Sequence, residues 1–200
     1  MKQLASIVVL ACGMAATGAA VAQAQVGQAA PAFTGTDTAG KQVSLADYKG
    51  KYVVLEWVNP DCPFVKKHYK SGNMQATQKH AASKGMAWLS VNTGSAASDA
   101  KQAAELGSWT REQKAVINNL VLDKGAIGRS YGAKTTPHMY VIDPAGKLVY
   151  AGAIDSKASS NAADIPGATN YVMQAVDELA AGKPVSKPVT QPYGCTVKYG

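Results

Sequence analysis

The chain has 200 residues, of which 46% are hydrophobic, 7% aromatic and 16% charged, and its formal net charge is +7. This length suits one domain with a short extension, and so small a charged fraction excludes a disordered acidic or basic chain. The basic residues are scattered, whereas a nucleic-acid-binding domain usually concentrates them on one stripe with interleaved aromatics. We therefore expect a folded, mildly basic domain that does not bind nucleic acid.

Residues 1–24 have the pattern of a secretory signal peptide. A single lysine is followed by an apolar run from Leu4 to Val21 and then by Ala22-Gln23-Ala24, which predicts cleavage after Ala24. The alternatives are an uncleaved membrane anchor and a lipoprotein acylated at Cys12, but the run is rich in Ala and Gly, which favour insertion weakly. Cleavage predicts an exported, periplasmic protein with no stable membrane insertion.

The first part of the remaining chain alternates predicted strands and helices. A hairpin is predicted over Ala32–Leu45, and a strand over Lys51–Val58, where nearly continuous apolar residues are typical of burial on both faces. A helical stretch follows from Cys62 to about Lys84, with a kink at Gly72. Met86–Asn92 is predicted to form a second buried strand.

The second part continues this alternation and ends in an extended tail. Helices are predicted over Ser98–Leu106 and Arg111–Asn118, the latter capped by Thr110. The further elements, in order, are a strand at Leu120–Leu122, a helical turn at Ala126–Tyr131, a hairpin of His138–Ile142 and Lys147–Ala153, and an amphipathic helix over Asn170–Ala181. Strands that alternate with helices predict an α/β domain with a mainly parallel sheet and an antiparallel edge.

Cys62 is the residue that most strongly suggests chemistry. It comes directly after a buried strand and opens a helix, where unpaired N–H groups and the helix dipole stabilise a thiolate and lower the pKa of a thiol. Lys66, one turn further on, favours the same charge state, and Asp61 opposes it. A buried, inert cysteine is the alternative. The position predicts a reactive thiol.

Three sequence runs carry a resemblance to a known family. VVLEWVNPDCPFV resembles the active-site strand, loop and helix of the thioredoxin fold, with Cys62 at the first cysteine of C-x-x-C and Val65 at the second. GRSYGAKTTPHMYVIDPAGKLVYAGAID resembles the redoxin version of that fold, in which Pro137 is the cis-proline that faces the nucleophile. With the closing PYGCTVKYG, the chain resembles bacterial peroxiredoxin-like redoxins of the alkyl hydroperoxide reductase/thiol-specific antioxidant superfamily.

The resemblance covers about residues 26–200 and implies a domain organisation. After the signal peptide, we expect a thioredoxin-like domain over residues 25–182, with a central mixed sheet flanked by helices and an N-terminal β-hairpin extension. Residues 183–200 are expected to be an extended C-terminal tail that carries Cys195. The family also implies a cis Thr136–Pro137 bond, which places both residues beside the reactive thiol.

Glu56 interrupts an apolar strand six residues before Cys62. A carboxylate there costs free energy unless it is neutral or paired, and burial raises its pKa. Because thioredoxins have an acidic proton relay at the corresponding place, the resemblance implies that Glu56 is a general acid or base. The alternative is a carboxylate that reaches solvent at the sheet edge or binds a nearby lysine.

Cys195 lies in a tail that is long enough to reach back across a domain of this size. It is expected to be a resolving thiol that attacks oxidised Cys62; the alternatives are a structural disulfide that fixes the tail, and an unpaired or intermolecular thiol. Cys62, His138 and Cys195 are also a conceivable copper or zinc site. Their spacing is not compact, so we predict no metal and no cofactor.

The leading functional hypothesis is a thiol peroxidase. Cys62 would attack a hydroperoxide and become a sulfenic acid, Cys195 would condense with it, and an external thiol or thioredoxin-like reductant would restore both thiols. By resemblance, Arg129 would polarise the peroxide. However, Leu55 and Asn59 occupy the positions at which peroxiredoxins have Pro and Thr or Ser. The alternatives are a thiol–disulfide oxidoreductase acting on disulfide substrates and a non-enzymatic copper or metal carrier on the same scaffold.

Overall fold

The computed structural model describes residues 23–94 and 99–199. The predicted signal peptide, residues 1–24, lies outside these ranges except for its last two residues. Within the two described ranges, no helix is long and apolar enough to cross a membrane.

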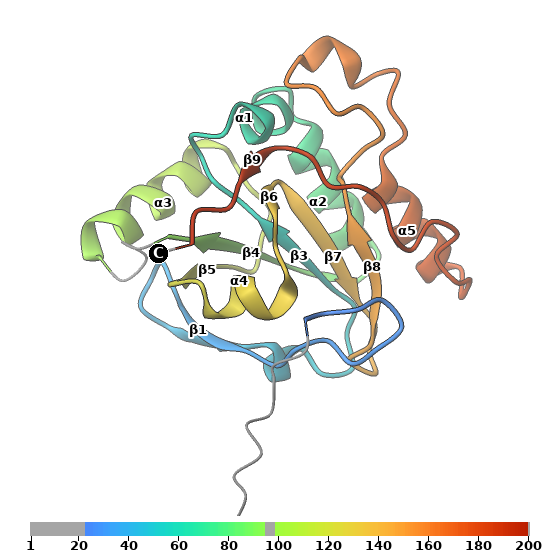
Figure 1. Cartoon of the computed structure of the whole chain (residues 1–200), viewed down its shortest axis with the longest axis horizontal. Helices are drawn as coiled ribbons and strands as arrows, with labels where there is room; N and C mark the ends of the chain where they lie inside the picture. The colour runs from blue at the N-terminus through green and yellow to red at the C-terminus, as the bar shows by residue number, and fades with distance from the viewer. Residues whose placement is uncertain (1–22, 95–98, 200) are drawn as a thin grey trace, which may run out of the picture.

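A mixed β-sheet forms the centre of the described domain (Figure 1). Its strand order is β2-β1-β5-β4-β3-β7-β8. Strands β3, β4 and β5 are parallel, and the remaining pairs are antiparallel. The strands are β1 (Thr34–Asp37), β2 (Gln42–Ser44), β3 (Val53–Trp57), β4 (Ala87–Thr93), β5 (Asn119–Asp123), β7 (His138–Ile142) and β8 (Leu148–Gly152). The predicted N-terminal hairpin is confirmed as β1 and β2, which extend the sheet at its edge.

Helices pack on both faces of the sheet. The face that contains Val54, Trp88 and Met139 is covered by α1 (Pro63–Lys70), α2 (Asn73–Ser83), α3 (Ala100–Glu112) and α5 (Tyr171–Ala180). The opposite face is covered by α4 (Ala126–Tyr131) and by the segment that precedes β1. Short 3-10 helices occur at Leu45–Tyr48 and Ala162–Asp164. Burial of apolar side chains on both faces explains why β3 reads as a continuous apolar run.

Two helix predictions needed revision. The stretch after Cys62 is interrupted at Gly72, whose positive φ of 78° ends α1 and begins α2. The helix predicted over Ser98–Leu106 is present from Ala100, and Ser98 lies outside the described residues. The separate helix predicted over Arg111–Asn118 is wrong, because α3 continues through Thr110 and ends at Glu112. The Thr110 hydroxyl donates to the Leu106 and Gly107 carbonyls inside the helix and does not cap a new one.

The C-terminal tail returns across the domain after α5 (red in Figure 1). It first runs beside β8, where Val189 forms a parallel bridge with Ala151. It then forms a short strand, β9 (Cys195–Thr196), which pairs antiparallel with β6 (Thr135–Thr136). The thioredoxin-like fold with a hairpin extension and an extended tail is therefore confirmed. The tail passes the start of α1 at Cys195 and ends beside α4, where Tyr199 contacts Arg129.

Candidate active site: a disulfide between helix α1 and the C-terminal tail

The loop between β3 and α1 positions Cys62. The Asn59 side chain accepts a hydrogen bond from the Asp61 backbone N–H at 2.9 Å, and the Asn59 carbonyl accepts one from the Cys62 N–H at 3.1 Å. Cys62 is the N-cap residue, Pro63 begins the helix, and the Cys62 carbonyl accepts the first helical hydrogen bond from Lys66. The sulfur therefore projects at the end of α1 where backbone N–H groups lack helical partners.

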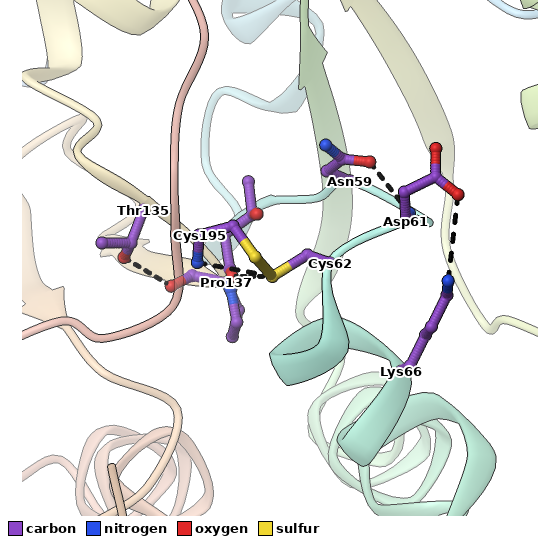
Figure 2. The surroundings of a disulfide bond; sticks show 8 residues. Asn59, Asp61, Cys62, Lys66, Thr135, Pro137 and Cys195 are labelled. Carbon is purple, nitrogen blue, oxygen red and sulfur yellow. Dashed lines mark hydrogen bonds and ion pairs between the residues drawn. A yellow bond between two sulfur atoms is a disulfide. The ribbon is translucent and has the colours of Figure 1, made fainter. Parts of the chain in front are cut away.

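Cys62 and Cys195 form a disulfide bond (Figure 2). Their Cα atoms are 5.8 Å apart, within the usual range for a disulfide, although 133 residues separate them in sequence. Cys62 is only 2% exposed, whereas Cys195 is half-buried. The structure thus brings together the two cysteines that the sequence singled out, and the tail supplies the partner that Val65 does not.

The loop before β7 covers the sulfur of Cys62 from another side. The Thr136–Pro137 bond is cis, as the family resemblance implied. The Thr136 carbonyl oxygen lies 3.0 Å from Cys62 Sγ, and the Cys195 backbone N–H points at the same sulfur with an N···S distance of 3.4 Å. Thr136 is also the residue opposite Cys195 in the β6–β9 pair. Cys62 is consequently enclosed between the cis-proline loop and the tail.

A buried polar cluster anchors the tail before Cys195. The Tyr193 hydroxyl donates to the Asp155 carboxylate and lies 3.1 Å from Nε2 of His68. Lys67 Nζ is 3.6 Å from Asp155 and donates to the Lys157 carbonyl at 3.1 Å. Burial lowers the pKa of His68 to about 4, although the nearby Asp155 carboxylate opposes this effect and Lys67 adds to it, so His68 is neutral at physiological pH.

Further contacts anchor the tail after Cys195. The Val197 N–H donates to the Lys134 carbonyl at 3.0 Å, and the Tyr199 hydroxyl donates to the Ala133 carbonyl at 2.6 Å. Arg129, which the family resemblance suggested as a peroxide-polarising cation, lies on α4 with its guanidinium 5.0 Å from the centre of the Tyr199 ring. Arg129 is therefore part of the surface on which the tail rests.

Glu56 lies fully buried within β3 and accepts several hydrogen bonds. The donors are the Tyr69 hydroxyl at 3.0 Å, Trp88 Nε1 at 2.9 Å, the Ser90 hydroxyl at 3.0 Å and the Gln78 side-chain amide at 3.4 Å. Burial raises the pKa of Glu56 to about 7, although these hydrogen bonds favour the charged form. The side chain neither reaches solvent nor pairs with a lysine, and it is poised to change protonation near neutral pH.

Lys66 forms a solvent-exposed ion pair with Asp61, at 3.9 Å (Figure 2).

His138 is on the other face of β7 from Met139, and its Nδ1 accepts from the Lys134 N–H at 3.2 Å. Burial lowers the pKa of His138 to about 3. In the part of the chain that the structure describes, no group of three or more His, Cys, Asp or Glu side chains is arranged to hold a metal ion.

A cavity of about 480 Å³ lies beside the disulfide. Its lining includes Asn59 from the loop before Cys62, Thr136 from β6 and Thr196 from β9. The Asn92 side-chain oxygen and the Thr136 hydroxyl are buried at this cavity without a hydrogen-bond partner in the described structure. The lining thus comes from residues that flank the two cysteines in the β3–α1 loop, β6 and β9.

The anchoring cluster was not found from the sequence. Tyr193 precedes Cys195 by two residues, but its partners come from α1 and from the loop after β8, which no periodicity connects. Part of the surroundings of Glu56 could be predicted from the sequence, because Ser90 is the neighbour of Glu56 in the β3–β4 register. A predicted parallel pair of these strands, with Glu56 and Ser90 aligned, is the signal that identifies one of its donors.

Comparisons with known proteins identify a matching family and similar chains. Residues 26–151 match the model of the AhpC/TSA family. The thiol-disulfide oxidoreductase ResA of Bacillus subtilis is 28% identical over 134 residues, which cover 62% of this chain and 64% of ResA. The chain thus spans slightly less than two thirds of that relative.

Two solved structures share the fold. An uncharacterised conserved protein from Geobacillus kaustophilus has a TM-score of 0.72 with 24% identity, over 88% of this chain and 93% of that one. The thioredoxin domain of a thiol-disulfide oxidoreductase from Bacteroides vulgatus has a TM-score of 0.52 with 28% identity, over 72% of this chain and 96% of that domain. The thioredoxin-like architecture is common to both.

Proposed function

The chain belongs to the AhpC/TSA family of thiol-based oxidoreductases, and from this premise we propose that it is a thiol–disulfide oxidoreductase whose redox centre is the Cys62–Cys195 disulfide. The observation that carries the proposal is the disulfide itself, which joins the thiol at the start of α1 to a cysteine of the docked tail. In a thioredoxin-type C-x-x-C motif the second cysteine is three residues away. Here that place is taken by Val65, and Cys195 supplies the second sulfur.

The reaction is an exchange of two electrons between the protein disulfide and a substrate dithiol. A substrate thiolate attacks one protein sulfur, a mixed disulfide forms, and the other protein cysteine leaves as a thiolate. The second substrate thiolate then attacks the substrate sulfur of the mixed disulfide. The substrate leaves as a disulfide and the protein as a dithiol; the reverse sequence reduces a substrate disulfide and is completed by an external thiol or a thioredoxin-like reductant.

A thiol peroxidase, the leading hypothesis from the sequence, is the less well supported alternative. Cys62 is 2% exposed in the disulfide form, and if the tail stays docked after reduction, it would also hinder a peroxide from reaching the Cys62 thiol. Leu55 is fully buried in β3, and the Asn59 side chain is used to shape the loop before Cys62. Neither supplies the Pro or the Thr/Ser hydroxyl that peroxiredoxins place there. The match to ResA also favours disulfide substrates.

Glu56 is proposed as the proton-exchanging group of this centre. Its hydrogen-bond donor Tyr69 lies on α1, the same helix that Cys62 caps, and both residues belong to one buried cluster. With a pKa of about 7, the Glu56 carboxyl is able to hold or release a proton at neutral pH. Its proposed role is to balance the charge that appears when a cysteine thiolate is released in an enclosed site.

An exported location fits this chemistry. Disulfides persist in compartments such as the bacterial periplasm and are rare in the cytosol. The signal peptide predicted over residues 1–24 would deliver the protein to such a compartment. Export is part of the proposal, together with the disulfide substrates.

The proposed function is tested by comparing two oxidants of the reduced protein. The full chain, with Cys12→Ser to remove the remaining cysteine, is mixed at neutral pH with 2-hydroxyethyl disulfide or with hydrogen peroxide, and free thiols are counted with time. We expect the small disulfide to restore the Cys62–Cys195 bond, and peroxide to oxidise the protein no faster than free cysteine. Rapid peroxide oxidation without reaction with the disulfide would overturn the proposal; the Cys62→Ser variant controls for reaction at other groups.

A further inference from the structure

We propose that Cys195, and not Cys62, is the sulfur that exchanges directly with external thiols and disulfides. This inference rests on the proposed function. It reverses the order that the sequence suggested, in which Cys62 attacks the substrate and Cys195 resolves the product. Three features of the structure lead to it: the unequal exposure of the two cysteines, the independent anchoring of the tail, and the stabilisation of a thiolate at Cys62.

The first feature is the unequal exposure of the two cysteines. Cys62 is 2% exposed, with the Thr136 carbonyl 3.0 Å from its sulfur and Pro137 also buried. Cys195 is half-buried, and the residue that follows it, Thr196, is exposed. Attack on a disulfide requires the nucleophile to reach the sulfur that it will bond. The access that the structure offers is to the tail cysteine.

The second feature is that the tail is held in place by contacts on both sides of Cys195. Before it, Tyr193 is bonded to buried Asp155, and after it, the Tyr199 hydroxyl binds the Ala133 carbonyl. The β6–β9 pair adds backbone hydrogen bonds at Cys195 itself. None of these contacts depends on the sulfur–sulfur bond. Reduction is therefore expected to leave the tail docked and Cys62 covered, so that Cys195 stays the accessible thiol in both redox states.

Gly194 allows the tail to approach the Thr136–Pro137 loop closely. Gly194 has a φ of 139°, and a Cβ at this position would collide with the Thr136 carbonyl oxygen. The glycine lets the tail pass close to the cis-proline loop and brings Cys195 to the sulfur of Cys62.

The third feature concerns the leaving group. Cys62 caps α1, where free backbone N–H groups favour a thiolate, and the Cys195 N–H points at its sulfur at 3.4 Å. In thiol–disulfide exchange, the more stable thiolate leaves faster. Attack on Cys195 expels the Cys62 thiolate, whereas attack on Cys62 would expel the Cys195 thiolate, which caps no helix. Chemistry and access favour the same sulfur.

The resulting steps are balanced. An external thiolate bonds to Cys195 Sγ, the Cys62–Cys195 bond breaks, and its electron pair remains on Cys62. A second external thiolate attacks the external sulfur of the mixed disulfide, which releases the external disulfide and the Cys195 thiolate. In the opposite direction, the Cys195 thiolate attacks an external disulfide, one external thiolate departs, and the Cys62 thiolate resolves the mixed disulfide on Cys195. Cys62 is thus the buried resolving residue.

The test locates the first adduct on the oxidised protein. The full chain with Cys12→Ser is mixed with 2-mercaptoethanol and quenched at successive early times with a large excess of N-ethylmaleimide in urea at pH 7, so that the covered thiol is exposed and alkylated at once. The protein is then digested without reduction for mass spectrometry. We expect mercaptoethanol on Cys195 and maleimide on Cys62 to exceed the opposite pattern by about tenfold or more. The excess should be largest at the earliest times, before any transfer between the cysteines.

The outcomes separate this inference from the proposed function. Mercaptoethanol on Cys62 with maleimide on Cys195, or equal amounts of both patterns, would overturn the inference while leaving the disulfide an active redox centre. If neither cysteine acquired the thiol in the folded protein but both did after denaturation in urea, the disulfide would be structural. That result would overturn the proposed function and the inference together.

Discussion

Replacement of Glu56 by Gln is expected to change how the stability of the protein depends on pH. Burial raises the pKa of Glu56 from its ordinary value of 4.5 to about 7. Between these two pH values the folded protein keeps a proton that the unfolded chain has lost. The contribution of Glu56 to the free energy of unfolding therefore falls as the pH rises through this window, and this contribution is highest below pH 4.5.

The magnitude follows from the size of the pKa change. At about 1.4 kcal/mol per pH unit, the Glu56 carboxyl lowers the stability of the wild-type protein by about 3 kcal/mol between pH 4.5 and pH 7. Glutamine has nearly the same shape and does not ionise. Its oxygen is able to accept from Trp88 and Ser90, and its amide to donate to the Tyr69 hydroxyl. The stability of Glu56→Gln relative to wild type should thus increase by about 3 kcal/mol from pH 4 to pH 8.

Urea unfolding of both oxidised proteins, followed by tryptophan fluorescence at intervals from pH 4 to pH 8, measures this difference. His68 and His138 contribute the opposite slope, because their pKa values are lowered in the folded state and stability is lost as the pH falls below about 6.5. Both histidines are present in both proteins, so their contribution cancels. Glu105→Gln, at an exposed position on α3, is the control and should follow wild type. Parallel curves for Glu56→Gln and wild type would refute the reasoning.

Three further substitutions test the attachment of the tail. Cys195→Ser should abolish turnover of a small disulfide and lower the free energy of unfolding by roughly 2–5 kcal/mol in urea titrations, because the cross-link is lost; unchanged stability would contradict a closed disulfide. Tyr193→Phe removes the hydroxyl that is bonded to Asp155 and should lower the free energy of unfolding by about 1.5–3 kcal/mol in the same assay. A decrease near zero would show that this contact does not hold the tail. Gly194→Ala should slow re-formation of the disulfide by about tenfold or more, measured by acid-quenched thiol counting, because its Cβ meets Thr136; a wild-type rate would show that β9 need not dock so closely.

The fold was largely predictable because its signals are local. The apolar runs at Lys51–Val58 and Met86–Asn92 identify buried strands. The loop at Pro137 that faces Cys62 came instead from the resemblance to redoxins. The error at α3 arose where local signals compete. Thr110 followed by Gln113 reads as a helix start, but the Thr110 hydroxyl returns to the carbonyls of its own helix. Side-chain hydrogen bonding in the middle of a helix looks the same in sequence as a cap.

Those parts of the candidate site were predictable in which the position of a residue along one strand or helix decides its surroundings. Cys62 lies at the N-terminus of α1, as its place after β3 indicated, and the buried Glu56 follows from its place within that strand. The contacts of Tyr193 and Arg129 were not predictable, since they depend on how the tail crosses elements that are distant in sequence. The number of cysteines in the sequence suggested a bond between Cys62 and Cys195, but only the three-dimensional path of the tail determines which of the two is more exposed to solvent.

The long sequence separation of the two cysteines has a consequence for biosynthesis. A C-x-x-C pair is complete as soon as one helical turn has been made, and it can oxidise before the rest of a domain exists. Here ribosomal synthesis must proceed through residue 195, and the sheet must form beneath the tail, before Cys62 meets its partner. A nascent or truncated chain that lacks Cys195 would carry Cys62 without its disulfide partner. Formation of the Cys62–Cys195 bond therefore requires a nearly complete and folded chain. A nonsense mutation shortly before residue 195 would remove this bond while leaving nearly all residues of the hydrophobic core in the chain.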